Sequence, residues 1–203
     1  MALLNEFFYA AILGFFSQNI AFEMGVGTGN LFKLSVDKSK KRRYFFLVML
    51  FSTLVSTAVT YAFDGMITSA CGGDLYLREA LRALVFVIVI AVIELALELI
   101  LGFLLPELRE KIGGYLPSAC MNSAVLAILL LNRQFEYGLL QSMLFALMAV
   151  LGFIVSVLLM QVLRERVVLV RCPETMKGVP LTFLAAGILS LAFSGLANMN
   201  FPY

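Results

Sequence analysis

Long hydrophobic runs, separated by short polar connections, occupy most of the chain. Most of them reach or exceed the roughly 20 apolar residues that a helix needs to cross a bilayer. They are continuously apolar, so the pattern indicates helices and not the alternating strands of a membrane barrel. The pattern predicts six transmembrane helices, at about Leu3–Leu34, Tyr44–Phe63, Leu81–Leu105, Leu116–Leu131, Gly138–Leu163 and Gly178–Met199. We therefore expect an all-α, polytopic membrane protein in which residues 1–203 form a single transmembrane domain.

The first and fourth runs carry matching interruptions. Each contains an Asn followed two residues later by Ala, and glycine or proline lies beside it. The residues that we expect at these breaks are Asn19, Gly25, Gly27, Gly29, Asn122 and Ser123. Interrupted spans at corresponding positions of two halves point to a site near the membrane midplane of an inverted-repeat protein. The alternative is that the glycines allow close helix packing and the Asn side chains bond across an interface.

The interruptions predict two inverted three-helix repeats, about residues 1–106 and 107–203, with helices 1 and 4 discontinuous. In each repeat, a broken helix precedes two further helices. Exposed N–H and C=O groups at helix ends carry partial charge, so a site between the two breaks could hold an ion, a cluster or an anionic group.

Composition and charge agree with the membrane assignment. The chain is 62% hydrophobic and 14% charged, with a mean hydropathy of +0.97, which excludes a soluble domain and a nucleic-acid partner. Twelve of the 15 Lys and Arg residues fall in the first, third and fifth connections. The positive-inside rule therefore places these loops in the cytoplasm and both termini outside, in a bacterial-type inner membrane. No basic segment precedes the first run, so we expect no cleavable signal.

Three carboxylates stand out as candidates for ion or proton handling. Glu94 and Glu98 lie four residues apart in the third run, and so on one helix face. Glu23 adjoins the first break. A carboxylate inside a membrane is a functional-site hypothesis by default. The alternative for Glu98 is that it reaches the cytoplasmic interface.

Cysteine and histidine usage limits the metal chemistry. The chain has no His and three Cys residues, which do not form a disulfide framework. Cys120, beside the second break, is a possible thiolate ligand. Free cysteine is also a common buried apolar residue. Cys71 and Cys172 have no metal-ligand spacing with another cysteine.

Several segments, in order, resemble the A/E-type membrane subunit of Rnf and Nqr electron-transport complexes. The likeness is specific from about Leu77 to Gly195 and looser in the first run. It is carried by residues 84–98 (LVFVIVIAVIELALE), 122–132 (NSAVLAILLLN), 140–145 (LQSMLF), 152–153 (GF), 163–166 (LRER) and 186–195 (AGILSLAFSG). Glu98 matches an acidic position of the family, whereas Glu94 is an addition.

The resemblance implies six spans in an inverted repeat and pairing with a homologous subunit of opposite orientation. The pair would share a [2Fe-2S] cluster, held by two cysteines from each subunit, within a complex that couples electron transfer to Na⁺ or H⁺ movement. Here the two ligand positions fall on Gly29 and Ser123. Iron–sulfur clusters normally need four thiolates. We therefore expect no cofactor in this chain alone. A cluster shared with a partner is the family alternative.

Three functional hypotheses follow. In the first, the chain is a non-catalytic membrane subunit of an Rnf/Nqr-like complex, scaffolding a midplane site beside a homologous partner and other subunits of the complex. In the second, it is a small inverted-repeat transporter or channel that has lost the cluster, acts as a homo- or hetero-dimer, and uses Glu23, Glu94 and Glu98 for ions. In the third, it is a purely structural subunit whose polar pocket is filled by protein.

Overall fold

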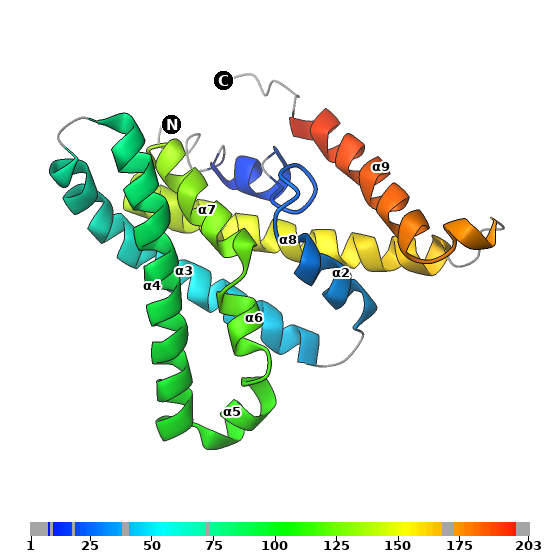
Figure 1. The fold of residues 1–203 in the computed structure, drawn as a ribbon, viewed down its shortest axis with the longest axis horizontal. Coiled ribbons are helices and arrows are strands. Elements are labelled where there is room, and N and C mark those ends of the chain that lie inside the picture. Colours follow the sequence, from blue (N-terminus) through cyan, green and yellow to red (C-terminus); the bar gives the residue numbers. More distant parts are fainter. Residues whose placement is uncertain are drawn as a thin grey trace.

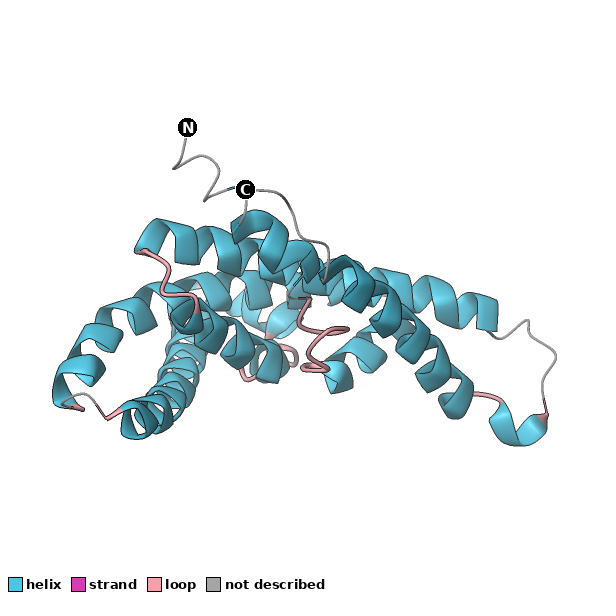
Figure 2. Ribbon diagram, turned by 90° about the horizontal axis from the view of Figure 1, so that it is seen from above, coloured by secondary structure: helices cyan, strands magenta, loops and turns pink. Residues whose placement is uncertain are grey.

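The fold is helical throughout the part of the chain that the structure describes. The computed structural model describes residues 8, 10–17, 19–37, 41–71, 74–167 and 173–197. Every regular element in these ranges is a helix, as Figures 1 and 2 show. The predicted all-α class is confirmed.

A broken helix precedes a pair of longer helices in each half. The elements of the first half are η1 (Leu13–Ser17), α2 (Thr28–Val36), α3 (Lys41–Ala70) and α4 (Leu75–Leu104). Those of the second half are α5 (Pro106–Ile112), α6 (Leu116–Cys120), α7 (Ser123–Gln134), α8 (Leu139–Val167), η2 (Glu174–Met176) and α9 (Val179–Ala197).

Four of the helical segments are long and apolar enough to cross a membrane. They are Arg42–Ala70, Leu75–Leu104, Leu116–Gln134 and Leu139–Val167, and a shorter apolar helix covers Val179–Gly195. The chain is therefore a multi-pass membrane protein. The helices α3, α4 and α8 extend several residues beyond the predicted apolar runs, because polar residues at their ends continue the helix outside the apolar stretch.

Local sequence accounts for several helix ends. The Asp74 carboxylate accepts hydrogen bonds from the N–H groups of Tyr76 (3.0 Å) and Leu77 (3.3 Å), so it caps the start of α4. Pro106 begins α5, where its missing N–H removes no helical hydrogen bond. Because a residue before proline disfavours helical geometry, α4 ends at Leu104.

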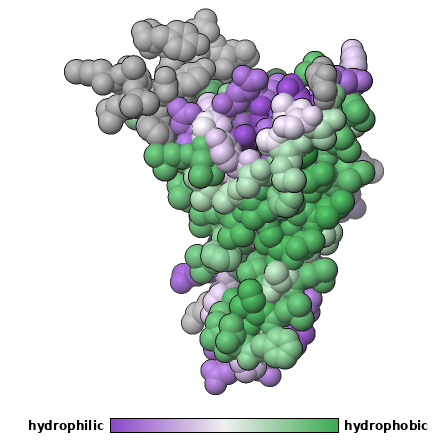
Figure 3. Space-filling model, turned by 90° about the vertical axis from the view of Figure 1, so that its left-hand side faces the viewer, coloured by the Kyte–Doolittle hydropathy of each residue, from purple (hydrophilic) through white to green (hydrophobic). Residues whose placement is uncertain are grey.

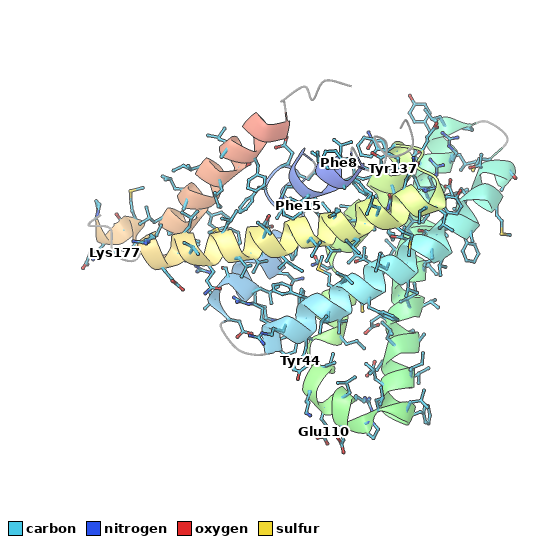
Figure 4. The ribbon with its side chains drawn as sticks, turned by 180° about the vertical axis from the view of Figure 1, so that it is seen from behind. Phe8, Phe15, Tyr44, Glu110, Tyr137 and Lys177 are labelled. Carbon is cyan, nitrogen blue, oxygen red and sulfur yellow. The ribbon has the colours of Figure 1, made fainter. Side chains whose placement is uncertain are left out.

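Helix α8 lies at the centre of the packing. It contacts α3, α7, α9, α2 and η1, and Figure 1 shows α4 and α9 at opposite edges of the molecule. Phe145 and Phe153 of α8 are fully buried. Gly152 allows close approach of the first segment, because a Cβ there would lie 2.7 Å from the Phe15 carbonyl oxygen. Figure 4 shows Phe15 next to α8.

The surface has the distribution expected of a membrane protein. Figure 3 shows a broad hydrophobic face with hydrophilic residues gathered at its two ends. Large apolar side chains of α4 and α9 are exposed, among them Phe103 (85%) and Leu191 (75%). Such exposure is normal against lipid or a partner and abnormal against water.

Candidate functional site

The first break is a structured turn that begins at Asn19. The Asn19 side-chain oxygen accepts a hydrogen bond from the Phe22 N–H (3.1 Å), and its carbonyl accepts one from the Glu23 N–H (2.8 Å). Gly25 (φ 66°) and Gly27 (φ 76°) adopt left-handed backbone geometry that favours glycine. The Asn and these two glycines therefore replace about two and a half turns of helix by a polar loop.

The second break is shorter and ends in a cap. Helix α6 stops at Cys120, and α7 begins at Ser123. Asn122 has extended geometry, and its side-chain oxygen accepts a hydrogen bond from the Ala124 N–H (3.2 Å). An Asn at this position stabilises a helix start by satisfying a free N–H, so Asn122 restarts the helix after the interruption.

The two breaks meet. The Gly27 N–H donates a hydrogen bond to the Ser123 hydroxyl (3.1 Å), and the Asn30 side-chain amide donates one to the Ser118 carbonyl (3.1 Å). A Cβ on Gly27 would lie 3.0 Å from the Ala124 Cβ. Polar groups that each break frees from its helix are therefore partly satisfied by the other break.

Helix α8 holds the first break in place. The Ser156 hydroxyl donates to the Asn19 side-chain oxygen (2.9 Å), and the Asn19 amide donates to the Gly152 carbonyl (3.3 Å). All of these groups are buried. Ser156 is not among the site residues predicted from sequence. Its spacing from Gly152, four residues along an apolar helix, is the signal that could have found it.

Two predicted site residues lie differently from expectation. The interruption is predicted at Gly25–Gly29, but it occupies Asn19–Gly27, because the Asn19 hydrogen bonds stop the helix earlier. Gly29 lies within α2, with no other group within 4 Å of the Cβ that it lacks. Ser123 lines a small cavity of about 180 Å³ at the second break. The other lining residues are Val87, Ile90, Met121, Asn122 and Leu126.

The three candidate carboxylates occupy different environments. Glu94 is buried (8% exposed) between α4 and its neighbours. The Glu98 side chain is 46% exposed, and its carboxylate lies 3.3 Å from the Arg109 guanidinium. Glu23 is exposed and accepts a hydrogen bond from the Ser194 hydroxyl (2.8 Å). The structure therefore separates the two acids that share a helix face, one inward and one at a charged surface.

The sequence as a whole matches one protein family. A family model described as "Rnf-Nqr subunit, membrane protein" matches residues 7–200.

The chain belongs to the Rnf-Nqr subunit family.

Bacterial relatives of this family are named as the A-type component of an ion-translocating oxidoreductase complex. The Azoarcus sp. (strain BH72) protein is 39% identical over 120 residues, which are 59% of this chain and 62% of that protein. The protein of Actinobacillus pleuropneumoniae serotype 5b is 31% identical over 98% of this chain and 93% of its own length. That of Syntrophotalea carbinolica is 31% identical over 75% of this chain and 77% of its own length.

The donor atoms at the breaks do not fit the iron–sulfur cluster that the Rnf-Nqr resemblance implies. Of the two expected ligand positions, Gly29 has no side chain, and the Ser123 hydroxyl is engaged by Gly27. Cys120 is fully buried beside Ile112 and Leu116. Cys71 and Cys120 are free thiols, and Cys172 lies outside the described residues. The described residues contain no cluster of three or more His, Cys, Asp or Glu side chains.

Proposed function

We propose that this chain is a non-catalytic membrane subunit of an ion-translocating oxidoreductase complex of the Rnf/Nqr type, and that it scaffolds a midplane site at the two meeting breaks. The hydrogen bond from the Gly27 N–H to the Ser123 hydroxyl carries this proposal, because it joins interruptions from opposite halves of the chain. Family membership and the names of the relatives support it.

We also propose that the single domain contains six spans in two inverted repeats. The packing supports this arrangement. In one half η1 packs on α8 of the other half, and reciprocally α6 packs on α3. The same reciprocity relates α2 on α8 to α7 on α3, and α3 contacts α8 at the centre. Such exchange of broken helices is what a pseudo-twofold axis in the membrane plane requires.

The proposed orientation keeps both termini outside and the basic loops in the cytoplasm of a bacterial-type inner membrane. The basic short helix α5 lies at the lower end of the molecule in Figure 1, and the facing ends of α3, α4, α7 and α8 lie at the upper left. Figure 4 likewise places Tyr44 and Glu110 toward one end and Tyr137 at the other. This separation agrees with odd and even loops on opposite faces.

A homologous partner of opposite orientation would cover the second break. Met121 is non-helical (ψ 40°) and 55% exposed. Irregular backbone at membrane depth is tolerated where protein or a cavity surrounds it, and not where it faces lipid. A partner at this face also explains the hollow lined by Val87 and Leu126.

The partner proposal is tested by photo-crosslinking in native membranes. We expect a photoreactive amino acid at Met121 to capture a homologous membrane protein of the complex, identified by mass spectrometry together with the other subunits. The same amino acid at Leu191, which is equally lipid-accessible but far from the breaks along α9, serves as the control. Capture at Leu191 alone, or of no homologous chain, would contradict the proposal.

The cofactor proposal has its own measurement. Because the break supplies no thiolate at Gly29 or Ser123, we propose that this chain holds no cluster by itself and that its contribution is a scaffold. Purified complex in which the site between this chain and its homologous partner contains no iron is the expected result. Near-stoichiometric iron at that site, with a thiolate charge-transfer band, would show that the partner supplies the ligands.

A second candidate function is an ion or proton transporter on the same scaffold. The buried carboxylate of Glu94 favours it, because such a group is expensive in a membrane unless it has a role. Ion flux into vesicles reconstituted with this chain alone would support this function over a purely structural one.

A further inference from the structure

A ridge of buried polar side chains runs along α3. Ser52, Ser56, Thr60 and Asp64 are spaced four residues apart, which places them on one helix face. The three hydroxyl residues are no more than 3% exposed, and the Asp64 side chain is 14% exposed. The ridge therefore extends about 18 Å through the interior of the bundle.

Two hydroxyls of this ridge have no hydrogen-bond partner. The Thr53, Thr57 and Thr60 hydroxyls donate to carbonyls one turn earlier, at distances from 2.6 to 2.8 Å. Ser52 and Ser56 make no such bond, and no described N or O group pairs with their hydroxyls. An unpaired buried polar group is destabilising, and alanine would fill the same space. The two serines therefore indicate a transient partner.

The outer end of the ridge is a cluster of buried charges. The Asp64 carboxylate receives hydrogen bonds from the Arg82 Nε (2.6 Å) and Nη2 (3.0 Å), and Arg133 lies 3.7 Å away. Arg82 also binds Glu79 (2.7 Å), which is 54% exposed. Asp64 is thus held ionised by two arginines, and the cluster connects the ridge to the surface.

The inner end of the ridge is level with Glu94. The Asp64–Arg82 pair fixes the antiparallel register of α3 and α4. Twelve residues further from this pair, α3 reaches Ser52 and α4 reaches Glu94. The Cys120 thiol of α6 interacts with both side chains. Between these levels, α4 faces the ridge with Phe86 and Ile90, which explains why the serines find no partner there.

The Glu94 carboxylate has no Lys or Arg within salt-bridge distance among the described residues. The neighbouring groups that can titrate are Cys120 of α6 and Glu98 on α4 itself. Arg109 of α5 is paired with Glu98. A charge at the centre of a membrane helix costs about 2.5–3.5 kcal/mol on insertion scales. Burial without a cation therefore favours the neutral acid.

We propose that Glu94 carries a proton and exchanges it with the membrane side that bears the Asp64–Arg82 pair, through water molecules that Ser52, Ser56 and Thr60 bind in turn. This inference rests on the proposed ion-translocating function. Successive ridge hydroxyls lie about 6 Å apart along the axis, which one water molecule can bridge. A hard metal cation would instead need several oxygen ligands at one level, and the ridge offers one per turn.

Carbodiimide labelling of the complex in sealed vesicles tests the proposal. Dicyclohexylcarbodiimide modifies protonated carboxyl groups in apolar surroundings. We expect mass spectrometry to find modified Glu94 and unmodified Glu98, which is paired with Arg109. The labelling rate should fall when the pH is raised on the Asp64 side and should not respond to the pH on the other side. Impermeant maleimide labelling of Ser69→Cys identifies the Asp64 side in the same preparation.

Hydroxyl variants separate a path from a merely buried acid. We expect Ser52→Ala and Ser56→Ala to slow the response of Glu94 labelling to a pH jump by about tenfold, equivalent to ~1.4 kcal/mol on the barrier. Ser69→Ala, which removes an exposed hydroxyl of α3, should leave it unchanged. Thermal unfolding confirms folding, and removal of an unpaired hydroxyl is not expected to destabilise the protein.

Three results would overturn the proposal: unmodified Glu94, a labelling rate that follows the other side, or an unchanged response in both serine variants. Protection of Glu94 by Na⁺ at constant pH would assign a metal cation in place of the proton. Failure here leaves the crosslinking of Met121 to a homologous partner unaffected, so it is distinguishable from failure of the proposed function.

Discussion

The Gly27 N–H and the Ser123 hydroxyl, 96 residues apart in sequence, are joined by a 3.1 Å hydrogen bond between two interrupted helices. Each interruption frees backbone groups that lipid cannot satisfy. Because the two interruptions face each other, they can exist within the membrane at lower free energy than either could alone. The relationship makes the breaks a single site.

Gly27 should tolerate no side chain. Its φ of 76° disfavours L-residues by about 1–2 kcal/mol, and a Cβ would lie 3.0 Å from Phe153 Cε2. Gly27→Ala should therefore lower the free energy of unfolding by at least about 2 kcal/mol. Gly29→Ala is the matched control, because Gly29 is helical and its Cβ would be free of contacts. Thermal unfolding in detergent should show stability unchanged or raised by Gly29→Ala. Equal losses in the two variants would show that the left-handed turn at Gly27 is not required.

Asn19 and Ser156 should act as one unit. Their 2.9 Å hydrogen bond is buried and links the first break to α8. A double-mutant cycle with Asn19→Ala and Ser156→Ala should give a coupling energy between about 0.6 and 1.7 kcal/mol, the range found between membrane helices. Chemical unfolding of the four proteins measures it. Strict additivity would show that the contact does not hold the break.

Asp64 should be critical for stability. Asp64→Asn removes the counter-charge of two arginines whose side chains are only 9% and 10% exposed. Breaking a buried ion pair in this way costs about 3–5 kcal/mol. Glu174→Gln removes a 95% exposed partner of Lys177 and should have no measurable effect. Comparable melting temperatures for the two variants would refute a structural role for the Asp64 cluster.

Ion transport should depend more on Glu94 than on Glu98. Glu94 is buried without a cation, whereas Glu98 lies at the surface beside Arg109. In reconstituted vesicles, Glu94→Gln should reduce coupled ion flux more than Glu98→Gln does. The reverse order would return Glu98 to first place, as its match to the acidic position of the family suggests.

The membrane class, the helices and the existence of both breaks could be predicted from sequence, because long apolar runs and Asn–Gly or Pro combinations act locally. The extent of the first break could not, since it depends on hydrogen bonds from Asn19 to its own turn and to Ser156 of α8. Similarly, the spacing of Glu94 and Glu98 places them on one helix face. Only the packing of α5 and α6 shows that one faces inward and the other meets Arg109.

A density map of the chain within its complex in lipid nanodiscs tests most directly whether the two breaks form one site. We expect a first helix interrupted between Ser17 and Thr28, a fourth interrupted at residues 121–122, and the Gly27 nitrogen within about 3.5 Å of the Ser123 hydroxyl. Continuous helices through Thr28 and Met121, with only apolar side chains between them, would contradict it.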